Sequence, residues 1–103
     1  MRLTYHTALV LHALLDGRHY GFDIMDATQL PSGTVYPILR RLNGEGYVRS
    51  RWEKDGTARR EQRPPRRYYE LTSGGTALAR ESGFRVRQMA NAAARLTPAK
   101  VEG

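Results

Sequence analysis

The sequence contains no cysteine, which excludes disulfide bonds and thiolate metal sites. Its three histidines and ten acidic residues show no spacing typical of a metal motif. No arrangement of serine, histidine and acid indicates a nucleophilic active site. We therefore expect neither a cofactor nor an enzymatic activity. A chain without disulfides suits a reducing compartment, so the expected location is cytoplasmic.

The sequence also lacks a long hydrophobic run. The apolar stretch from Ala8 to Leu15 is interrupted by His12 and ends at Asp16, whereas a membrane-spanning helix needs about 20 apolar residues. The basic segment of the chain has no apolar helical face beside it that would lie on a membrane. We therefore expect a buried amphipathic helix near the N-terminus and no membrane association.

Acidic residues are scarce relative to basic ones. The 103 residues suit one small domain and contain 17 Lys and Arg against 10 Asp and Glu, a net charge of +7. Residues 51–67 hold seven of those basic side chains and only three acids. This concentration favours a polyanionic partner, although a basic surface loop that is merely solvated has the same composition.

Hydrophobic periodicity predicts three helices in the first half of the chain. The first, over 4–15, is apolar on nearly all sides, which predicts a second packing neighbour such as another copy of the chain. The second runs from Phe22 to Thr28, with Phe22 expected in the core. The third begins at Ser32, which we expect to cap it, and ends at Asn43. Its spacing of Val35, Leu39 and Leu42 places one face against the core.

Side chains that alternate with a period of two predict two strands, over 47–53 and 66–72. A basic loop at 54–65 joins them. Trp52, at the end of the first strand, is expected in the core or at an interface rather than stacked on a ligand. Thr72 is placed to cap a last helix that runs to Leu96. That helix has two apolar faces, which predicts contacts with its own domain and with a partner.

This order predicts a mainly α fold with a small β-hairpin, namely a winged helix-turn-helix with a C-terminal dimerisation helix. The expected divisions are a DNA-binding domain at 1–72, the dimerisation helix at 73–96 and a flexible tail at 97–103. In such a fold the third helix enters the major groove of double-stranded DNA, and the hairpin loop forms a wing that reaches phosphates or the minor groove.

Two sets of candidate residues follow from this arrangement. The expected DNA-binding side chains lie outside the core face of the third helix or in the wing: Ser32, Thr34, Tyr36, Arg40, Arg41, Lys54, Arg59, Arg60 and Arg63. The expected homodimer contacts lie on the first and last helices: Leu11, Leu78, Val86, Met89 and Leu96.

Three ordered segments resemble the PadR family of bacterial transcriptional regulators: GTVYPILRRLNGEGYV at 33–48, SRWE at 50–53 and RPPRRYYELTSGG at 63–75. The resemblance covers about residues 8–80. It implies a homodimeric DNA-binding repressor, often released by a small molecule, whose terminal helix supplies much of the dimer contact. It also implies that Tyr36 binds a backbone phosphate.

Two features depart from the family pattern. The connection between the second and third helices, ATQLPS, is very short, and the C-terminal part resembles members with a single terminal helix. A small aromatic effector would then bind at the dimer interface between the first and last helices. Two other partners remain open, since a basic winged helix also suits structured RNA or an acidic protein.

Overall fold

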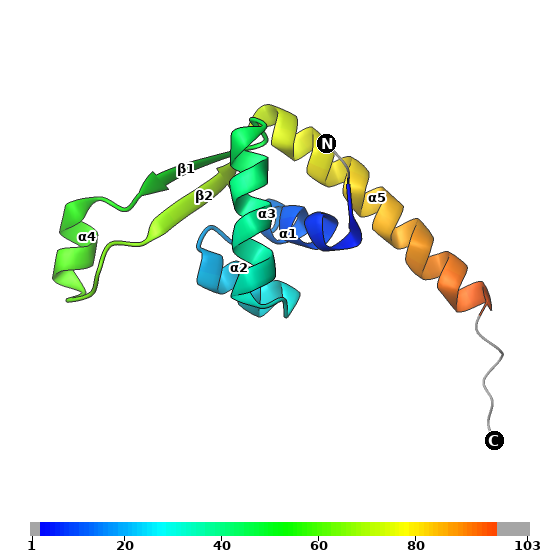
Figure 1. The fold of residues 1–103 in the computed structure, drawn as a ribbon, viewed down its shortest axis with the longest axis horizontal. Helices are drawn as coiled ribbons and strands as arrows, with labels where there is room; N and C mark the ends of the chain where they lie inside the picture. Colours follow the sequence, from blue (N-terminus) through cyan, green and yellow to red (C-terminus); the bar gives the residue numbers. More distant parts are fainter. Residues whose placement is uncertain (1–2, 97–103) are drawn as a thin grey trace, which may run out of the picture.

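The computed structural model describes residues 3–96. In α4 and the second half of α5 it describes the backbone but only some of the side chains. The elements follow the predicted order with one addition: α1 (Tyr5–Leu15), α2 (Gly21–Thr28), α3 (Ser32–Gly44), β1 (Val48–Trp52), α4 (Asp55–Arg60), β2 (Arg67–Leu71) and α5 (Ser73–Leu96). Helices α1, α2 and α3 pack together with the start of α5, while the hairpin and the rest of the long α5 project in different directions (Figure 1). This is a winged helix-turn-helix.

The core lies where α1, α2 and α3 meet the base of the hairpin and the first turns of α5. Its fully enclosed side chains include Leu11, Ile24, Leu39 and Leu42, each at most 1% exposed. Burial of such aliphatic side chains contributes roughly 1.5–3 kcal/mol each. Leu11 therefore has no surface left for a partner in this conformation, and its assignment to a dimer interface is wrong. Most of the apolar circumference of α1 is covered within one chain, whereas Tyr5 and Leu15 remain exposed at its two ends.

Helix α3 presents the expected core face. Val35, Leu39 and Leu42 are buried as their spacing predicted. Its cap differs from the prediction, because Pro31 occupies the N-cap position and Ser32 is the first helical residue, with no side-chain capping bond. Pro37 lies inside the helix at an exposed position and removes one backbone hydrogen bond there.

Helix α2 is short and covers one side of the core with Ile24. The expectation for Phe22 is wrong, because its side chain is 76% exposed. Phe22 is the second residue of α2 and Ile24 the fourth. Side chains two positions apart point to different sides of a helix, so burial of Ile24 leaves Phe22 outside.

The hairpin is antiparallel, with Val48 opposite Leu71 and Trp52 opposite Arg67. The base of the hairpin is joined to the α1–α2 connection, where the Tyr69 N–H donates to the His19 carbonyl at 2.7 Å. Trp52 is 61% exposed, so the prediction of a core position is wrong. The predicted loop at 54–65 is also only partly correct, because its first half forms α4.

Helix α5 begins at the expected cap, since the Gly75 N–H donates to the Thr72 hydroxyl oxygen at 3.0 Å. Its first half packs on α1, with Ala79 and Ser82 fully buried. A Cβ at Gly83 would overlap the His12 imidazole, so glycine permits the close approach of the two helices. The second half of α5 extends beyond α1 (Figure 1).

The predicted dimer contacts are distributed unevenly over the described chain. Leu78 is partly buried against the core, whereas the side chains of Val86, Met89 and Leu96 lie outside the described residues, as does the predicted tail 97–103. Among the helices that the structure describes, none combines the length and apolar character needed to cross a membrane.

Candidate nucleic-acid interface

A polar stripe runs along α3 beside its buried face. Tyr36, Arg40 and Asn43 are exposed and follow one another at i, i+4 and i+7, which places them on one side of the helix. This stripe faces the hairpin across a groove of about 310 Å³. The side chains lining the groove are Tyr36, Leu39, Arg40, Asn43, Ser50, Arg67 and Tyr69.

The opposite wall of the groove is one face of the hairpin. Strand alternation and the observed register place Ser50 and Arg67 on the face that also carries buried Val48. Arg67 Nη2 donates to the Ser50 hydroxyl at 2.9 Å. Asn43 Nδ2 donates to the same oxygen at 3.4 Å and so connects α3 with the hairpin.

Hydrogen-bond donors dominate this groove. Each of its six polar lining residues carries an N–H or O–H group, and none of the residues lining it is acidic. Two of them, Arg40 and Arg67, carry a permanent positive charge. Hydrogen bonds from arginine to phosphate are charge-assisted and can be bidentate. The groove is therefore suited to an anion with several acceptor oxygens.

Tyr36 is held at the α2 end of the groove. Its side chain is 38% exposed, and its hydroxyl lies so close to Gly21 that a Cβ there would overlap it. The tip of the ring is thus packed against the start of α2, while the residue as a whole stays partly exposed. Tyr69 forms the floor, and burial raises the pKa of its phenol, so this group is a neutral donor at physiological pH.

The outer end of the hairpin face carries a stacked pair. The Arg67 guanidinium lies 5.4 Å from the centroid of the Trp52 ring, within the range of a cation–π contact. The stack and the bond to Ser50 together fix the plane of the guanidinium. Arg67 is therefore oriented before any ligand arrives.

A buried carboxylate anchors the wing. Arg63 binds Glu53 through two parallel bonds, Nη1 to Oε1 at 2.6 Å and Nη2 to Oε2 at 2.8 Å. The Arg66 N–H and the Tyr20 hydroxyl also donate to Glu53, at 2.9 and 3.3 Å. These bonds, above all those from Arg63, lower the pKa of Glu53 to about 2.

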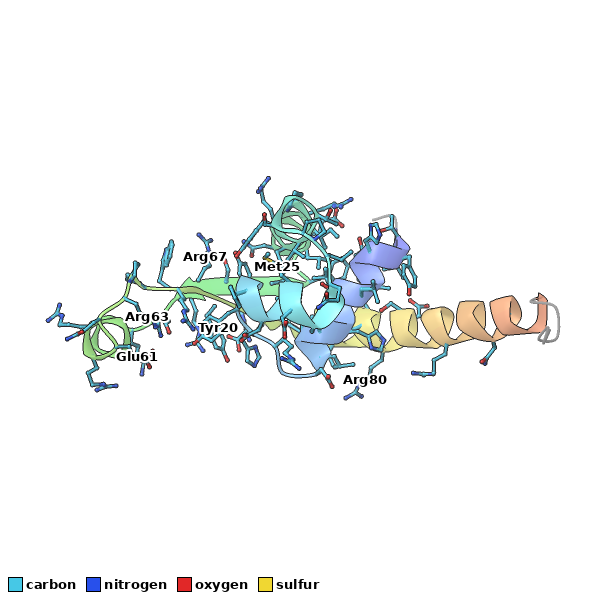
Figure 2. The ribbon with its side chains drawn as sticks, turned by 90° about the horizontal axis from the view of Figure 1, so that it is seen from below. Tyr20, Met25, Glu61, Arg63, Arg67 and Arg80 are labelled. Carbon is cyan, nitrogen blue, oxygen red and sulfur yellow. The ribbon has the colours of Figure 1, made fainter. Side chains whose placement is uncertain are left out.

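Arg63 therefore has a structural role that the sequence did not indicate. Its Nε also donates to Glu61 at 2.8 Å, and its side chain is only 18% exposed. In Figure 2, Arg63 and Glu61 lie together beside α4. Since Arg63 is occupied by two carboxylates, it is less suited to bind DNA than the other predicted wing cations.

The tip of the wing is helical. Arg59 and Arg60 are exposed in the last turn of α4, and Lys54 is exposed just before it. A helix with its side chains is about 10–12 Å wide, whereas the minor groove of B-DNA is about 6 Å wide. The α4 backbone therefore cannot enter the minor groove, and its cations would meet phosphates.

Comparison with known proteins decides the family. The sequence model of the PadR-like family of transcriptional regulators matches residues 10–81. The chain belongs to the PadR-like family. No curated protein matches it in sequence.

Solved structures support the same fold for this PadR-like chain. BpsR of Bordetella bronchiseptica, whose DNA binding is regulated by 6-hydroxynicotinic acid, is 27% identical with a TM-score of 0.72, over 95% of this chain and 70% of BpsR. A PadR family regulator of Clostridium difficile is 19% identical with a TM-score of 0.68, over 87% and 96%. MepR of S. aureus, solved as a DNA complex, is 21% identical with a TM-score of 0.66, over 93% and 67%.

In this PadR-like chain the predicted DNA-binding residues fall into separate groups. Tyr36 and Arg40 lie in the α3–hairpin groove, while Arg41 is exposed in the last turn of α3 without lining the groove. Ser32 is exposed at the start of α3, and Thr34 is half-buried. The wing cations lie on and next to α4, and the predicted roles in DNA binding remain predictions.

Three groove residues of the PadR-like chain, Asn43, Ser50 and Arg67, were not among the predicted DNA-binding residues. A signal for each was present. Asn43 continues the helical stripe of Tyr36 and Arg40 by one more turn. Ser50 and Arg67 alternate in phase with Val48 and Leu71, so burial of those two aliphatic side chains places the polar pair on the face toward α3.

Proposed function

We propose that the protein is a cytoplasmic, homodimeric transcriptional repressor that binds a pseudo-palindromic operator. The groove between α3 and the hairpin, lined by donors and by no acid, is the observation that carries this proposal. A DNA phosphate at Arg40 and Arg67 would place the N-terminal part of α3 toward the major groove. Membership of a family of transcriptional regulators and the net charge of +7 support the same partner.

Within this proposal the wing and α3 have different tasks. Tyr36, Arg40 and Arg67 hold the backbone at the groove, while Ser32 and Thr34 lie at the end of α3 that faces base edges. Lys54, Arg59 and Arg60 add phosphate contacts from the wing. The division into a DNA-binding part at 1–72 and a dimerisation helix at 73–96 belongs to the same proposal.

Binding-site selection from genomic DNA tests this function, followed by titration of the selected duplex. We expect the selected duplex to compete far better than random duplex, with discrimination of roughly 10³-fold or more. An RNA hairpin and an acidic protein serve as competitors in the same titration. Stronger competition by either of these than by the selected duplex would contradict the DNA proposal and identify the class of partner.

The homodimer is proposed from the apolar character of α5, whose second half extends beyond the helices of its own chain (Figure 1). Two such helices from two chains would bury apolar residues including Val86 and Met89, while Leu78 contributes from the first half. Light scattering at micromolar concentration should give twice the chain mass of 11.7 kDa. Val86→Asp with Met89→Asp should give monomers with weaker operator binding, whereas a monomeric wild-type protein would contradict the dimer.

We propose further that a small aromatic effector releases the protein from its operator. BpsR, a relative in fold at 27% identity, has its DNA binding regulated by 6-hydroxynicotinic acid, which supports an effector for this chain. We place that site between the first and last helices of the dimer. Loss of operator binding on addition of a planar aromatic compound is the expected result, and unaltered operator binding with every compound of such a panel would contradict it.

A further inference from the structure

A second hollow adjoins the α3–hairpin groove at the start of α2. Its volume is about 180 Å³, and its lining includes Phe22 of α2 and Arg66, which directly precedes β2. Tyr36, Arg67 and Tyr69 line both this hollow and the groove. The two therefore share part of their walls, and we call the second one the α2 hollow.

The α2 hollow, like the groove, is suited to phosphate. It is lined by two arginines and by no acidic residue. The Arg66 guanidinium lies 5.5 Å from the centroid of the Tyr20 ring, within the range of a cation–π contact. No carboxylate among the described residues pairs with it. Because the two hollows share a wall, a phosphate at Arg66 fits a neighbouring position on the strand whose phosphate we assign to Arg40 and Arg67.

Phe22 is the apolar exception in this lining. The tyrosines and arginines of the α2 hollow all carry an O–H or N–H donor, and Gly21 has no side chain. The Phe22 side chain is 76% exposed, so the core does not use it. Phe22 also borders a separate hollow of about 390 Å³, whose lining includes Asp26 and no cation. A phosphate backbone is therefore attracted to the arginine side of this ring and not to the Asp26 side.

We propose that Phe22 packs against a deoxyribose of the operator and thereby makes the protein select DNA over RNA. This inference rests on the proposed function, because it needs a phosphate at Arg66 and Arg67. Every phosphate within a strand is bonded to a sugar on each side. A phosphate in the α2 hollow therefore brings a sugar to the lining that Phe22 supplies.

The two kinds of sugar differ at the atom that an apolar ring detects. Carbon 2′ of deoxyribose is a methylene group, and its contact with the Phe22 ring removes apolar surface from water. Ribose carries a 2′-hydroxyl, which is both a donor and an acceptor. Burial of that hydroxyl against a phenyl ring leaves it without a hydrogen-bond partner, which is unfavourable.

Single ribonucleotides in the selected duplex test this inference. Each is placed at one position at a time, and the affinity is measured by fluorescence anisotropy at fixed salt. We expect a position at which one ribonucleotide weakens binding of the wild-type protein by about fivefold or more. A 2′-fluoro nucleotide at this position should bind like the deoxynucleotide, because it has a ribose-like sugar pucker but no hydroxyl. The pair of substitutions thus separates burial of the hydroxyl from a change in the shape of the duplex.

Substitutions assign the effect to Phe22. Phe22→Ala should fold, because the ring lies outside the core, and it should bind the ribonucleotide duplex and the all-deoxy duplex equally. Phe22→Leu keeps an apolar side chain and should retain the preference for deoxyribose. Tyr5→Ala is the matched control, since it removes a ring that is 51% exposed at the start of α1 and lines neither hollow. This control should retain the full preference.

A neutral phosphate analogue places the sugar next to Arg66. A methylphosphonate at the phosphate beside that sugar should weaken binding of the wild-type protein and have no further effect in Arg66→Met. An equal loss in Arg66→Met, an equal ribonucleotide penalty in Phe22→Ala, or no sensitive position in the wild type would overturn the inference and leave the proposed function standing. Failure of the wild-type protein to bind any duplex would contradict the proposed function and the inference together.

Discussion

Gly21 leaves space for the side chain of Tyr36, which is distant from it in sequence. Because a methyl group there would overlap the Tyr36 hydroxyl, Gly21→Ala should push the tip of that ring out of its place in the groove. We expect the variant to fold and to bind all duplexes more weakly, by up to about 1.5–3 kcal/mol, the range for a hydrogen bond to a charged group. Fluorescence anisotropy with selected and random duplex measures the change.

Gly44→Ala is the matched control for Gly21→Ala. A Cβ at Gly44 meets no atom within 4 Å, and alanine suits the helix better than glycine. This variant should bind DNA like the wild-type protein. Wild-type affinity in a folded Gly21→Ala protein would show that the Tyr36 hydroxyl does not contact DNA.

Glu53 makes the base of the wing sensitive to acid. Arg63 and the other donors hold the pKa of Glu53 at about 2, below its usual value of 4.5. A carboxylate whose pKa is lowered by folding stabilises the folded state above its usual pKa, and this contribution is lost as the pH falls from about 4.5 to about 2. The emission of neighbouring Trp52 should therefore change across this interval.

Glu53→Gln should remove that acid-dependent change, because its amide does not ionise. Glu61→Gln is the control, since Glu61 also binds Arg63 but is 57% exposed, and it should retain the transition. An unchanged transition in Glu53→Gln would assign the acid sensitivity to a different group.

At the scale of elements, the wing tip provides the test of phosphate contacts. Each phosphate neutralised adds about −0.9 to the slope of log affinity against log salt concentration. Arg59→Ala with Arg60→Ala should flatten the slope by up to about 2 units per wing and change discrimination between duplexes little. Arg63→Ala should mainly loosen the wing, because that side chain binds Glu53. An unchanged slope in the double variant would show that α4 does not touch DNA.

Most elements could be predicted from sequence, because their signals are local. The spacing of Val35, Leu39 and Leu42 and the cap at Thr72 gave α3 and the start of α5 correctly. Helix α4 was missed because Gly56 and the prolines at 64–65 indicated a loop. Yet Asp55 and the following alanine and arginines favour a short helix, so the two local signals were in conflict.

Side-chain partners were harder to predict, because they depend on how elements pack. The pairing of Arg63 with Glu53 joins residues ten positions apart across a turn that includes α4. Periodicity does not reveal such a contact, and composition alone made Arg63 resemble the other wing cations. Leu11 was misassigned for a similar reason, since periodicity shows how much of a helix is apolar but not which neighbour covers it.

At the scale of the whole molecule, the two sides of the hairpin offer different chemistry. The α3 side presents donors without acids, which suits the phosphates of DNA. The other side combines the rings of Tyr20 and Tyr68 with Arg51, Lys54 and Glu53, whose charge Arg63 compensates. Both sides share one short hairpin, so the position of the wing is the structural link between them.

The affinity of the selected duplex for a groove variant tests the central claim most directly. Arg40→Met with Arg67→Met removes both permanent charges from the α3–hairpin groove, and Arg80→Met removes one from the exposed surface of α5. Anisotropy at fixed salt should show at least tenfold weaker binding for the double variant, a loss of about 1.4 kcal/mol or more, and wild-type binding for Arg80→Met. Binding of the folded double variant within about twofold of wild type would contradict the assignment of this groove to DNA.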